Sequence, residues 1–437
     1  RVSAPNYVNR GPGNLGGRTR ALVYDKSDPT GNTILAGAIS GGVFRTTNGG
    51  ASWTKVSSQD EIHNVTTIAQ DPRPGFQNIW YYGTGEVLGN SASLNGAFYY
   101  GRGIWKSEDS GLTWTQIASS NSVQETFDNR FDFVHRLAVH PVTGDVYAGI
   151  VGQLARYNGT TWTAERNDAT ASGNKLVDVI ITSTGRVYCA FSGNSDASIR
   201  GIWSSATGIG GWSRIADNGT PTGWSMSGRV VLGLAPSNEN ILYALYLKTG
   251  TTPSPGDCDL WRWNQASTTW TNFSSKIPDE PGGSAGNDPF NSQGAYDLVV
   301  NVKPDNENFV VIGGTNAYKI NNINTDAFVR IGGYDGPSTY ALWNNGGGTN
   351  HHPDVHALEF NPFSPNVLFS GTDGGIHKTI DLNAATVGWT NLNNNYQTYQ
   401  YYHVNIDPQA GSDGVIGGAQ DDGTTSGGTS LGEANLT

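Results

Sequence analysis

The chain has 437 residues, of which 59 are Gly and 19 are Pro, whereas only 14% are charged and 36% are hydrophobic. This composition excludes a coiled coil, a helical bundle and a charged disordered polymer, and it favours short strands joined by turns. The net charge of −11 repels phosphate backbones and anionic lipids, so no nucleic acid is expected as a partner. No stretch approaches about 18 apolar residues, so no insertion into a membrane is expected.

Along the chain, a strand-like pentad recurs seven times. The copies are GVFRT (42–46), GIWKS (103–107), QLARY (153–157), GIWSS (201–205), DLWRW (259–263), NAYKI (316–320) and GIHKT (375–379). An aromatic residue follows each pentad after a turn, on average about 56 residues from the next: Trp53, Trp114, Trp162, Trp212, Trp270, Phe328 and Trp389. A period of this kind indicates a fold built from packed repeats.

Two further strand-like runs precede each pentad, such as VHALEF and NVLFSG before GIHKT. Turns rich in Pro, Asn and Asp separate the two runs, for example HPVTG and NPFSPN. One repeat therefore contains four antiparallel strands. Seven such repeats predict an all-β fold, a β-propeller of seven four-stranded blades.

After the seventh repeat the pattern starts again with YYHVNIDPQAG (401–411) and GVIGGAQDDG (414–423), which indicate a first and a second strand without a third and a fourth. Two arrangements fit: seven blades, or eight blades with a closing strand from residues 1–17. We therefore expect an N-terminal segment at 1–17, the seven-repeat propeller at 18–396, and a partial eighth repeat and tail at 397–437.

The turn after the pentad reads TTNGGASW (46–53) in the first repeat and SEDSGLTW (107–114) in the second. This pattern resembles the Asp-box (BNR-type) propellers, which include sialidases, sortilin-like receptors, xyloglucan-cleaving tandem propellers and many secreted bacterial proteins. The turn also has a structural explanation. Asn48 or Asp109 can accept hydrogen bonds from turn amides, Gly50 or Gly111 permits a positive φ, and the Trp packs between blades.

The segments NRGPGNLGGRTRALVYD (9–25), HPDVHALEFNP, GTDGGI and GAQDDGT resemble secreted bacterial sortilin-like and glycosidase-like propeller proteins. The resemblance implies a secreted or cell-surface bacterial protein. The arginine motif of sialidases is missing, so sialidase activity is not expected. The xyloglucan-cleaving enzymes place two aspartates in a cleft between two propellers, and one propeller of this length supplies half of that architecture.

The long connections, residues 86–101, 248–257, 276–293 and 333–350, all belong to the face opposite the Asp-box turns. Long loops on a rigid scaffold commonly carry binding. The candidate recognition aromatics in these loops are Phe98, Tyr99, Tyr100, Tyr334, Tyr340 and Trp343. The alternative is that these loops cover the channel mouth and bury the rings against neighbouring blades.

Charged and imidazole side chains are expected on the same face. Arg18 and Arg20 lie two residues apart on a strand and either bind a ligand carboxylate or form a buried ion pair. His352, Asp354 and His356 alternate along a strand and therefore point to one side. They could hold a transition metal, form an acid and base pair, or hydrogen-bond at the channel mouth. Three ligands on one straight strand lie too far apart for one ion.

Asp373, Asp421 and Asp422 end second strands and form the candidate metal site. Three carboxylates suit Ca²⁺ or acid–base chemistry, although DGG and DDG are also ordinary turn sequences. No cofactor is required, and Ca²⁺ is the candidate ion. Cys189 and Cys258 either pair or remain free thiols.

The predicted function is that of a secreted propeller that binds an extracellular glycan or protein through its long-loop face. The alternative is a glycoside hydrolase that acts on a polysaccharide with carboxylates of that face. The sequence leaves open whether the protein is an enzyme.

Overall fold

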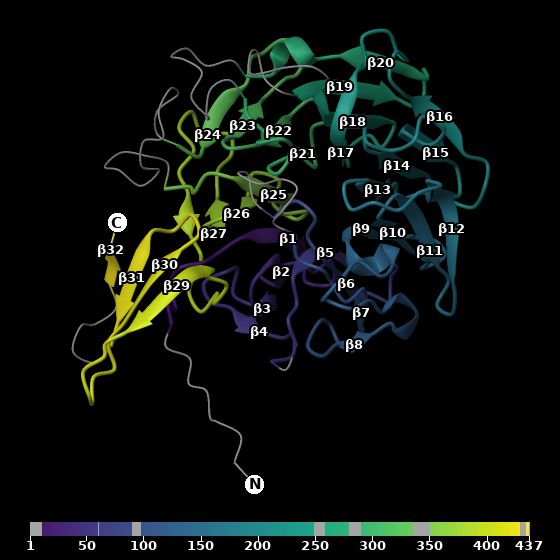
Figure 1. The fold of residues 1–437 in the computed structure, drawn as a ribbon. Coiled ribbons are helices and arrows are strands. Elements are labelled where there is room, and N and C mark those ends of the chain that lie inside the picture. Colours follow the sequence, from purple (N-terminus) through teal and green to yellow (C-terminus); the bar gives the residue numbers. More distant parts are fainter. Residues whose placement is uncertain are drawn as a thin grey trace.

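The computed structural model describes residues 11–59, 61–89, 98–248, 258–278, 290–334 and 350–428, and the backbone of 434–436. These residues form eight four-stranded antiparallel sheets. Seven sheets are arranged around a common centre as a ring, and the eighth, at the C-terminal end, projects outward from it (Figure 1). The fold is therefore all-β and a propeller, as the repeat pattern predicts.

The strands of the first four sheets follow one another in the chain. Sheet one contains β1 (Thr19–Tyr24), β2 (Ile34–Ala38), β3 (Gly42–Thr46) and β4 (Thr54–Lys55). Sheet two contains β5 (Val65–Gln70), β6 (Trp80–Thr84), β7 (Ile104–Ser107) and β8 (Thr115–Gln116). Sheet three contains β9 (Val134–Val139), β10 (Val146–Ile150), β11 (Gln153–Tyr157) and β12 (Trp162–Asn167). Sheet four contains β13 (Val177–Ile181), β14 (Val187–Phe191), β15 (Gly201–Ser205) and β16 (Ser213–Ala216).

The remaining sheets repeat this order. Sheet five contains β17 (Met226–Leu234), β18 (Ile241–Lys248), β19 (Cys258–Asn264) and β20 (Thr269–Asn272). Sheet six contains β21 (Val299–Val302), β22 (Val310–Gly313), β23 (Ala317–Ile320) and β24 (Val329–Gly332). Sheet seven contains β25 (Val355–Phe360), β26 (Leu368–Thr372), β27 (Gly375–Thr379) and β28 (Thr390–Asn391). The outer sheet contains β29 (Tyr401–Ile406), β30 (Val415–Ala419), β31 (Thr424–Gly427) and β32 (Ala434–Leu436). Three 3₁₀ turns complete the described elements: Ala118–Ser120, Arg130–Asp132 and Ser274–Lys276.

All seven recurring pentads coincide with third strands to within one residue at either end, from β3 in the first sheet to β27 in the seventh. The repeat pattern therefore located every blade of the ring. The aromatic residue after the pentad packs between blades, as expected. Trp53 is 3% exposed and donates from Nε1 to the carbonyl of Leu392 at 2.7 Å, across the contact between the first and seventh sheets. Trp389 makes the equivalent bond to Ile331 of the sixth sheet at 2.6 Å.

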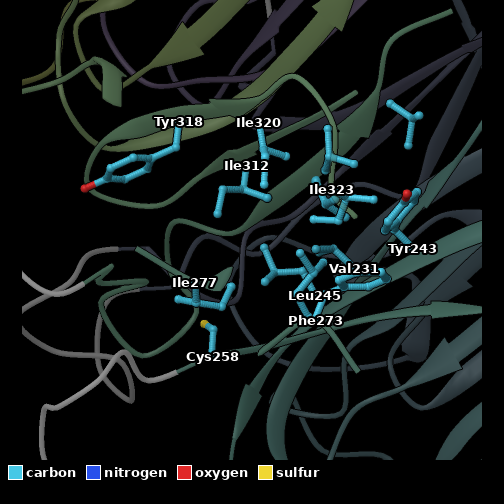
Figure 2. Packing of buried hydrophobic residues seen from close by; sticks show 14 of the residues in the cluster. Val231, Tyr243, Leu245, Cys258, Phe273, Ile277, Ile312, Tyr318, Ile320 and Ile323 are labelled. Atoms are coloured by element: carbon cyan, nitrogen blue, oxygen red, sulfur yellow. The ribbon is translucent and has the colours of Figure 1, made fainter. Parts of the chain in front are cut away.

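The apolar core lies between neighbouring sheets rather than in one central cluster. In the largest cluster, side chains of the fifth sheet such as Tyr243 and Leu245 pack against Ile312 and Ile320 of the sixth (Figure 2). The ring closes in the same way, because β1 packs against β25 and β26 of the seventh sheet. Closure therefore uses side-chain packing between two complete sheets.

The Asp-box turns have the geometry that their sequence indicates. Asn48 Oδ1 accepts a hydrogen bond from the Ser52 amide at 3.0 Å, and Asp109 Oδ1 accepts one from the Thr113 amide at 2.9 Å. Gly50 adopts a φ of +90° and Gly111 a φ of +78°. These residues shape turns at the end of the ring opposite the long loops.

The outer sheet differs from expectation in one respect. The sequence indicated two strands there, whereas the structure has four, because β31 and β32 extend the pairing beyond residue 423. Residues 11–17 form no closing strand, and residues 1–10 lie outside the described residues. Every residue of β29 is exposed, in contrast to the largely buried β1 and β25.

Cys189 and Cys258 are both buried, and no disulfide joins these two described residues, so the open question of their pairing resolves to two thiols. Cys189 lies on β14 and Cys258 begins β19. Within the described part of the chain, no helix is long and apolar enough to cross a membrane.

Candidate functional site

Charged side chains from four sheets of the ring and from the outer sheet converge at one end of the ring. In each antiparallel hairpin the first strand begins, and the second ends, at the same end of the sheet. Residues that precede a first strand or follow a second strand in different blades therefore meet there once the ring closes. The residues so placed, or lying near the start of a first strand, are Arg18 (before β1), Arg20 (β1), Glu86 (after β6), Gln293, Tyr296 and Asp297 (before β21), Asp354 (before β25), His356 (β25), Asp373 (after β26), and Asp421 and Asp422 (after β30).

Arg18 is 1% exposed and joins two blades. It donates from Nη1 to Glu86 Oε2 at 2.6 Å and from Nε to Asp373 Oδ1 at 3.1 Å. Burial disfavours the charge of Arg18, but Glu86 and Asp373 outweigh it and hold the pKa of the guanidinium well above its usual value. Arg18 is therefore committed to a buried ion-pair network.

Arg20 donates to four acceptor groups. It contacts Glu86 Oε1 at 2.5 Å and donates to the carbonyls of Tyr296 and Leu88, each at 2.9 Å. Its Nη1 also lies 2.9 Å from His356 Nδ1. Since an arginine only donates, His356 Nδ1 accepts and the proton sits on Nε2. Burial and the charge of Arg20 lower the pKa of His356 to about 3, so the ring is neutral.

Asp373 is held as an anion by several hydrogen-bond donors of the cluster. His356 Nε2 donates to Oδ1 at 2.7 Å, and the Tyr296 hydroxyl donates to Oδ2 at 2.6 Å. Burial alone would raise the pKa of Asp373, but His356, Arg18 and Tyr296 together hold it well below its usual range. One lone pair of Oδ2 remains for a further partner.

Asp297 and Asp354 face each other across one amide group. Gln293 Nε2 donates to Asp297 Oδ2 at 2.6 Å and to Asp354 Oδ1 at 2.7 Å. Burial and the neighbouring carboxylates raise the pKa of both aspartates well above the usual value. In this part of the site two carboxyl groups share one amide donor, which cannot neutralise their charge.

The metal-type grouping differs from the predicted one. Among the described residues, the group with the spacing of metal ligands consists of Asp354, Asp373 and Asp421. Each offers one oxygen within 4.8 Å of the others. Asp422 is not a member of it, because its carboxyl faces His352 Nε2 at 3.6 Å. His352 and His356 also lie outside this group. Asp354 adopts a φ of +61°, so the chain bends before β25 and the strand alternation does not extend back to His352.

Asp421 provides the accessible edge of the cluster. The residue is exposed, but its carboxyl points toward the buried Asp373. Desolvation at that contact and the charge of Asp373 raise the pKa of Asp421 to about 7. Burial and the charges of Asp421 and Asp373 likewise raise the pKa of Asp422.

The predicted recognition aromatics have different environments. Phe98 and Tyr99 are each 40% exposed, and Tyr99 pairs through its backbone with Glu86. Tyr100 packs on Phe133 instead, at a centroid distance of 5.5 Å. Tyr334 is partly buried, and its carbonyl accepts a bond from Arg330. Tyr340 and Trp343 lie outside the described residues.

Tyr402 on β29 is an exposed ring that sequence reasoning missed. It is 72% exposed. Partial desolvation and the nearby Asp421, Tyr99 and Asp373 raise the pKa of its hydroxyl, which places Tyr402 within electrostatic reach of all three. Tyr99, which follows the second strand of the second sheet, and Tyr402 of the outer sheet thus lie within electrostatic reach of each other.

Glu86, Gln293, Tyr296 and Asp297 were also missed by sequence reasoning. Glu86 and Gln293 lie within loops that the sequence singles out by length, and Tyr296 and Asp297 follow the second of these loops. No repeat or charge pattern distinguishes these four residues from ordinary loop positions. Their partners come from other blades and are not visible in the chain order.

A cavity of about 680 Å³ lies within the ring and is lined by residues of all seven inner strands. Arg20 and His356 line it and also belong to the site. Farther from the cluster it is lined by Glu359, Arg136 and Lys26. The site therefore adjoins the central channel.

Solved structures with similar folds include large carbohydrate-active enzymes. A GH74 xyloglucanase from Xanthomonas campestris is 17% identical with a TM-score of 0.65; the match covers 94% of this chain and 59% of that one. A GH74 enzyme from Niastella koreensis is 20% identical with a TM-score of 0.63, and the match covers 97% of this chain and 60% of that one. The extracellular domain of a putative one-component system from B. thetaiotaomicron is 14% identical with a TM-score of 0.50, and the match covers 93% of this chain and 45% of that one.

These similarities establish the propeller fold. The chain spans less than two thirds of the length of each of these three proteins. No protein-family model matches the chain, and no curated protein sequence matches it.

Proposed function

We propose that the protein is an extracellular, secreted bacterial propeller of the Asp-box type that binds a glycan where Tyr99, Tyr402 and Asp421 meet. The observation that carries this proposal is that two exposed tyrosine rings lie within electrostatic reach of each other, and that Tyr402 lies within the same reach of Asp421 and Asp373. Aromatic rings offer apolar faces to sugar rings, and carboxylates accept hydrogen bonds from sugar hydroxyls.

The surroundings of these residues support a preformed site. Tyr99 is held by a two-way backbone bond with Glu86, at 2.9 and 2.8 Å, and Glu86 is fixed by Arg18 and Arg20. A rigid site loses less conformational freedom on binding. The similarity to a xyloglucanase and to an extracellular domain favours a polysaccharide ligand outside the cell.

A binding screen tests this proposal. The purified chain would be titrated with xyloglucan and with a panel of other plant and bacterial polysaccharides, and binding would be followed by affinity electrophoresis and calorimetry. We expect binding to at least one neutral polysaccharide. Binding to none of them, or binding that survives loss of the exposed rings, would contradict the proposal.

A second candidate is a glycoside hydrolase that uses Asp373 and Asp421. Their carboxylate oxygens lie within 4.8 Å of each other, near the separation of about 5 Å between the two carboxyls of retaining glycosidases. Reducing-end release from any bound polysaccharide tests this candidate. Release that disappears in Asp421→Asn would support hydrolysis, and binding without release would leave the protein a binding module.

A further inference from the structure

The three carboxylates of Asp354, Asp373 and Asp421 have the spacing of ligands around one ion. They come from three separate segments, and one oxygen from each lies within 4.8 Å of the others. Oxygens on opposite sides of a calcium ion are about 4.6–5.2 Å apart, since each Ca–O distance is about 2.3–2.6 Å. One cation could therefore contact all three.

Asp297 supplies an independent observation. It is completely buried, and its Oδ1 has no hydrogen-bond partner among the described residues. His356 Nδ1 lies 3.5 Å from Oδ1 and already accepts from Arg20, so it has no proton to offer. The carboxyl faces Asp354 across the shared Gln293 amide. A buried carboxyl oxygen without a donor is costly unless the group is protonated or a cation is nearby.

The charges around the cluster also favour a cation. Three arginines lie within electrostatic reach of it: Arg18, Arg20 and Arg229. Six carboxylates oppose them: Glu86, Asp297, Asp354, Asp373, Asp421 and Asp422. A divalent cation bound there would offset the repulsion among these carboxyl groups in their ionised forms. Because the three oxygens are carboxylates without thiolate or imidazole ligands, a hard cation fits better than zinc.

We propose that Asp354, Asp373 and Asp421 bind one calcium ion, which ties the outer sheet to the ring. Asp354 and Asp373 belong to the seventh sheet, whereas Asp421 belongs to the turn between β30 and β31. Exposure of Asp421 gives the ion a route from solvent. Water molecules would complete a shell of about 6–8 oxygens. This site shares Asp421 with the proposed glycan site, but calcium binding is measured without any sugar, so the failure of one proposal is distinguishable from the failure of the other.

Calorimetry with CaCl₂ alone tests the site on chain treated first with a chelator. We expect one calcium per chain, a melting temperature several degrees higher with calcium than without it, and slower proteolysis within residues 401–428 when calcium is present. Absence of calcium binding, or an unchanged melting curve, would overturn the proposal.

Asp421→Asn is the diagnostic variant because Asp421 is the exposed member of the group. We expect at least ten-fold weaker calcium binding. Asp407→Asn is the matched control on the same outer sheet, where Asp407 accepts bonds only from Gln409 and Ser412 of its own turn. The control should bind calcium like the parent chain. Undiminished binding by Asp421→Asn, or equal loss in both variants, would place the ion elsewhere and overturn the proposal.

Discussion

Arg20 Nη1 lies 2.9 Å from His356 Nδ1, and this contact fixes which nitrogen of His356 carries the proton. The proton on Nε2 is directed at Asp373, 2.7 Å away. The first and seventh sheets are thus joined by a chain of polar contacts as well as by packing. The charged cluster is therefore part of what closes the ring.

Replacing Arg20 with Met should destabilise the protein by about 3–5 kcal/mol, because it leaves the buried carboxylate of Glu86 with one partner fewer. Urea unfolding measures this. Arg136→Met is the control: Arg136 is 53% exposed and 3.8 Å from Asp178, so its loss should cost less than about 1 kcal/mol. Equal effects of the two substitutions would show that the network does not support the ring.

Trp53→Ala should cost about 3–5 kcal/mol, because it removes a buried ring and a hydrogen bond at the contact between the first and seventh sheets. Glycan and calcium binding should persist in the folded fraction, because the Asp-box end is opposite the site. Phe363→Ala removes a ring that is 44% exposed, and it should change stability by less than about 0.5 kcal/mol. Loss of binding without loss of stability in Trp53→Ala would give the Asp-box end a functional role.

Glu359 predicts a pH dependence of stability. Burial raises its pKa to about 7, despite the opposing charges of Arg136 and Lys26, whereas the ordinary value is 4.5. The folded state therefore holds this proton more tightly than the unfolded state, and the associated stability is lost as the pH rises from about 4.5 to 7.

Glu359→Gln removes this loss of stability at high pH, because the glutamine amide does not titrate. Relative to the parent chain, the variant should gain about 3 kcal/mol of stability between pH 4 and pH 8. Chemical unfolding at both pH values measures the difference, with the exposed Glu108→Gln as control. A difference from the parent chain that does not change with pH would show that Glu359 titrates normally.

The ring could be predicted from the sequence because it depends on local patterns repeated seven times. Each pentad marks the third strand of its own blade, and Trp53 and Trp389 mark the contact of their blade with the preceding one. The site could be predicted only in part. Asp354, Asp373 and Asp421 stand in recognisable turn motifs, so their common end of the ring followed from strand order.

The partners of those residues could not be predicted. Glu86 contacts Arg18 from 68 positions away, and Tyr296 contacts Asp373 from 77 positions away. Such pairs are set by blade order around a closed ring and not by any local pattern. Tyr402 was missed because YYHVNI matches the first strand of a repeat, whereas β29 lies outside the ring with both faces exposed.

The most direct test of the account is polysaccharide binding by the double variant Tyr99→Ala with Tyr402→Ala. Binding would be measured by calorimetry against the polysaccharide that the screen selects, with xyloglucan included, and folding would be followed by thermal melting. Phe363→Ala is the control for loss of an exposed ring at the other end. The account predicts at least a roughly ten-fold loss of affinity in the double variant, an unchanged melting temperature, and normal binding by the control. Unchanged affinity in a well-folded double variant would contradict a glycan site at Tyr99, Tyr402 and Asp421.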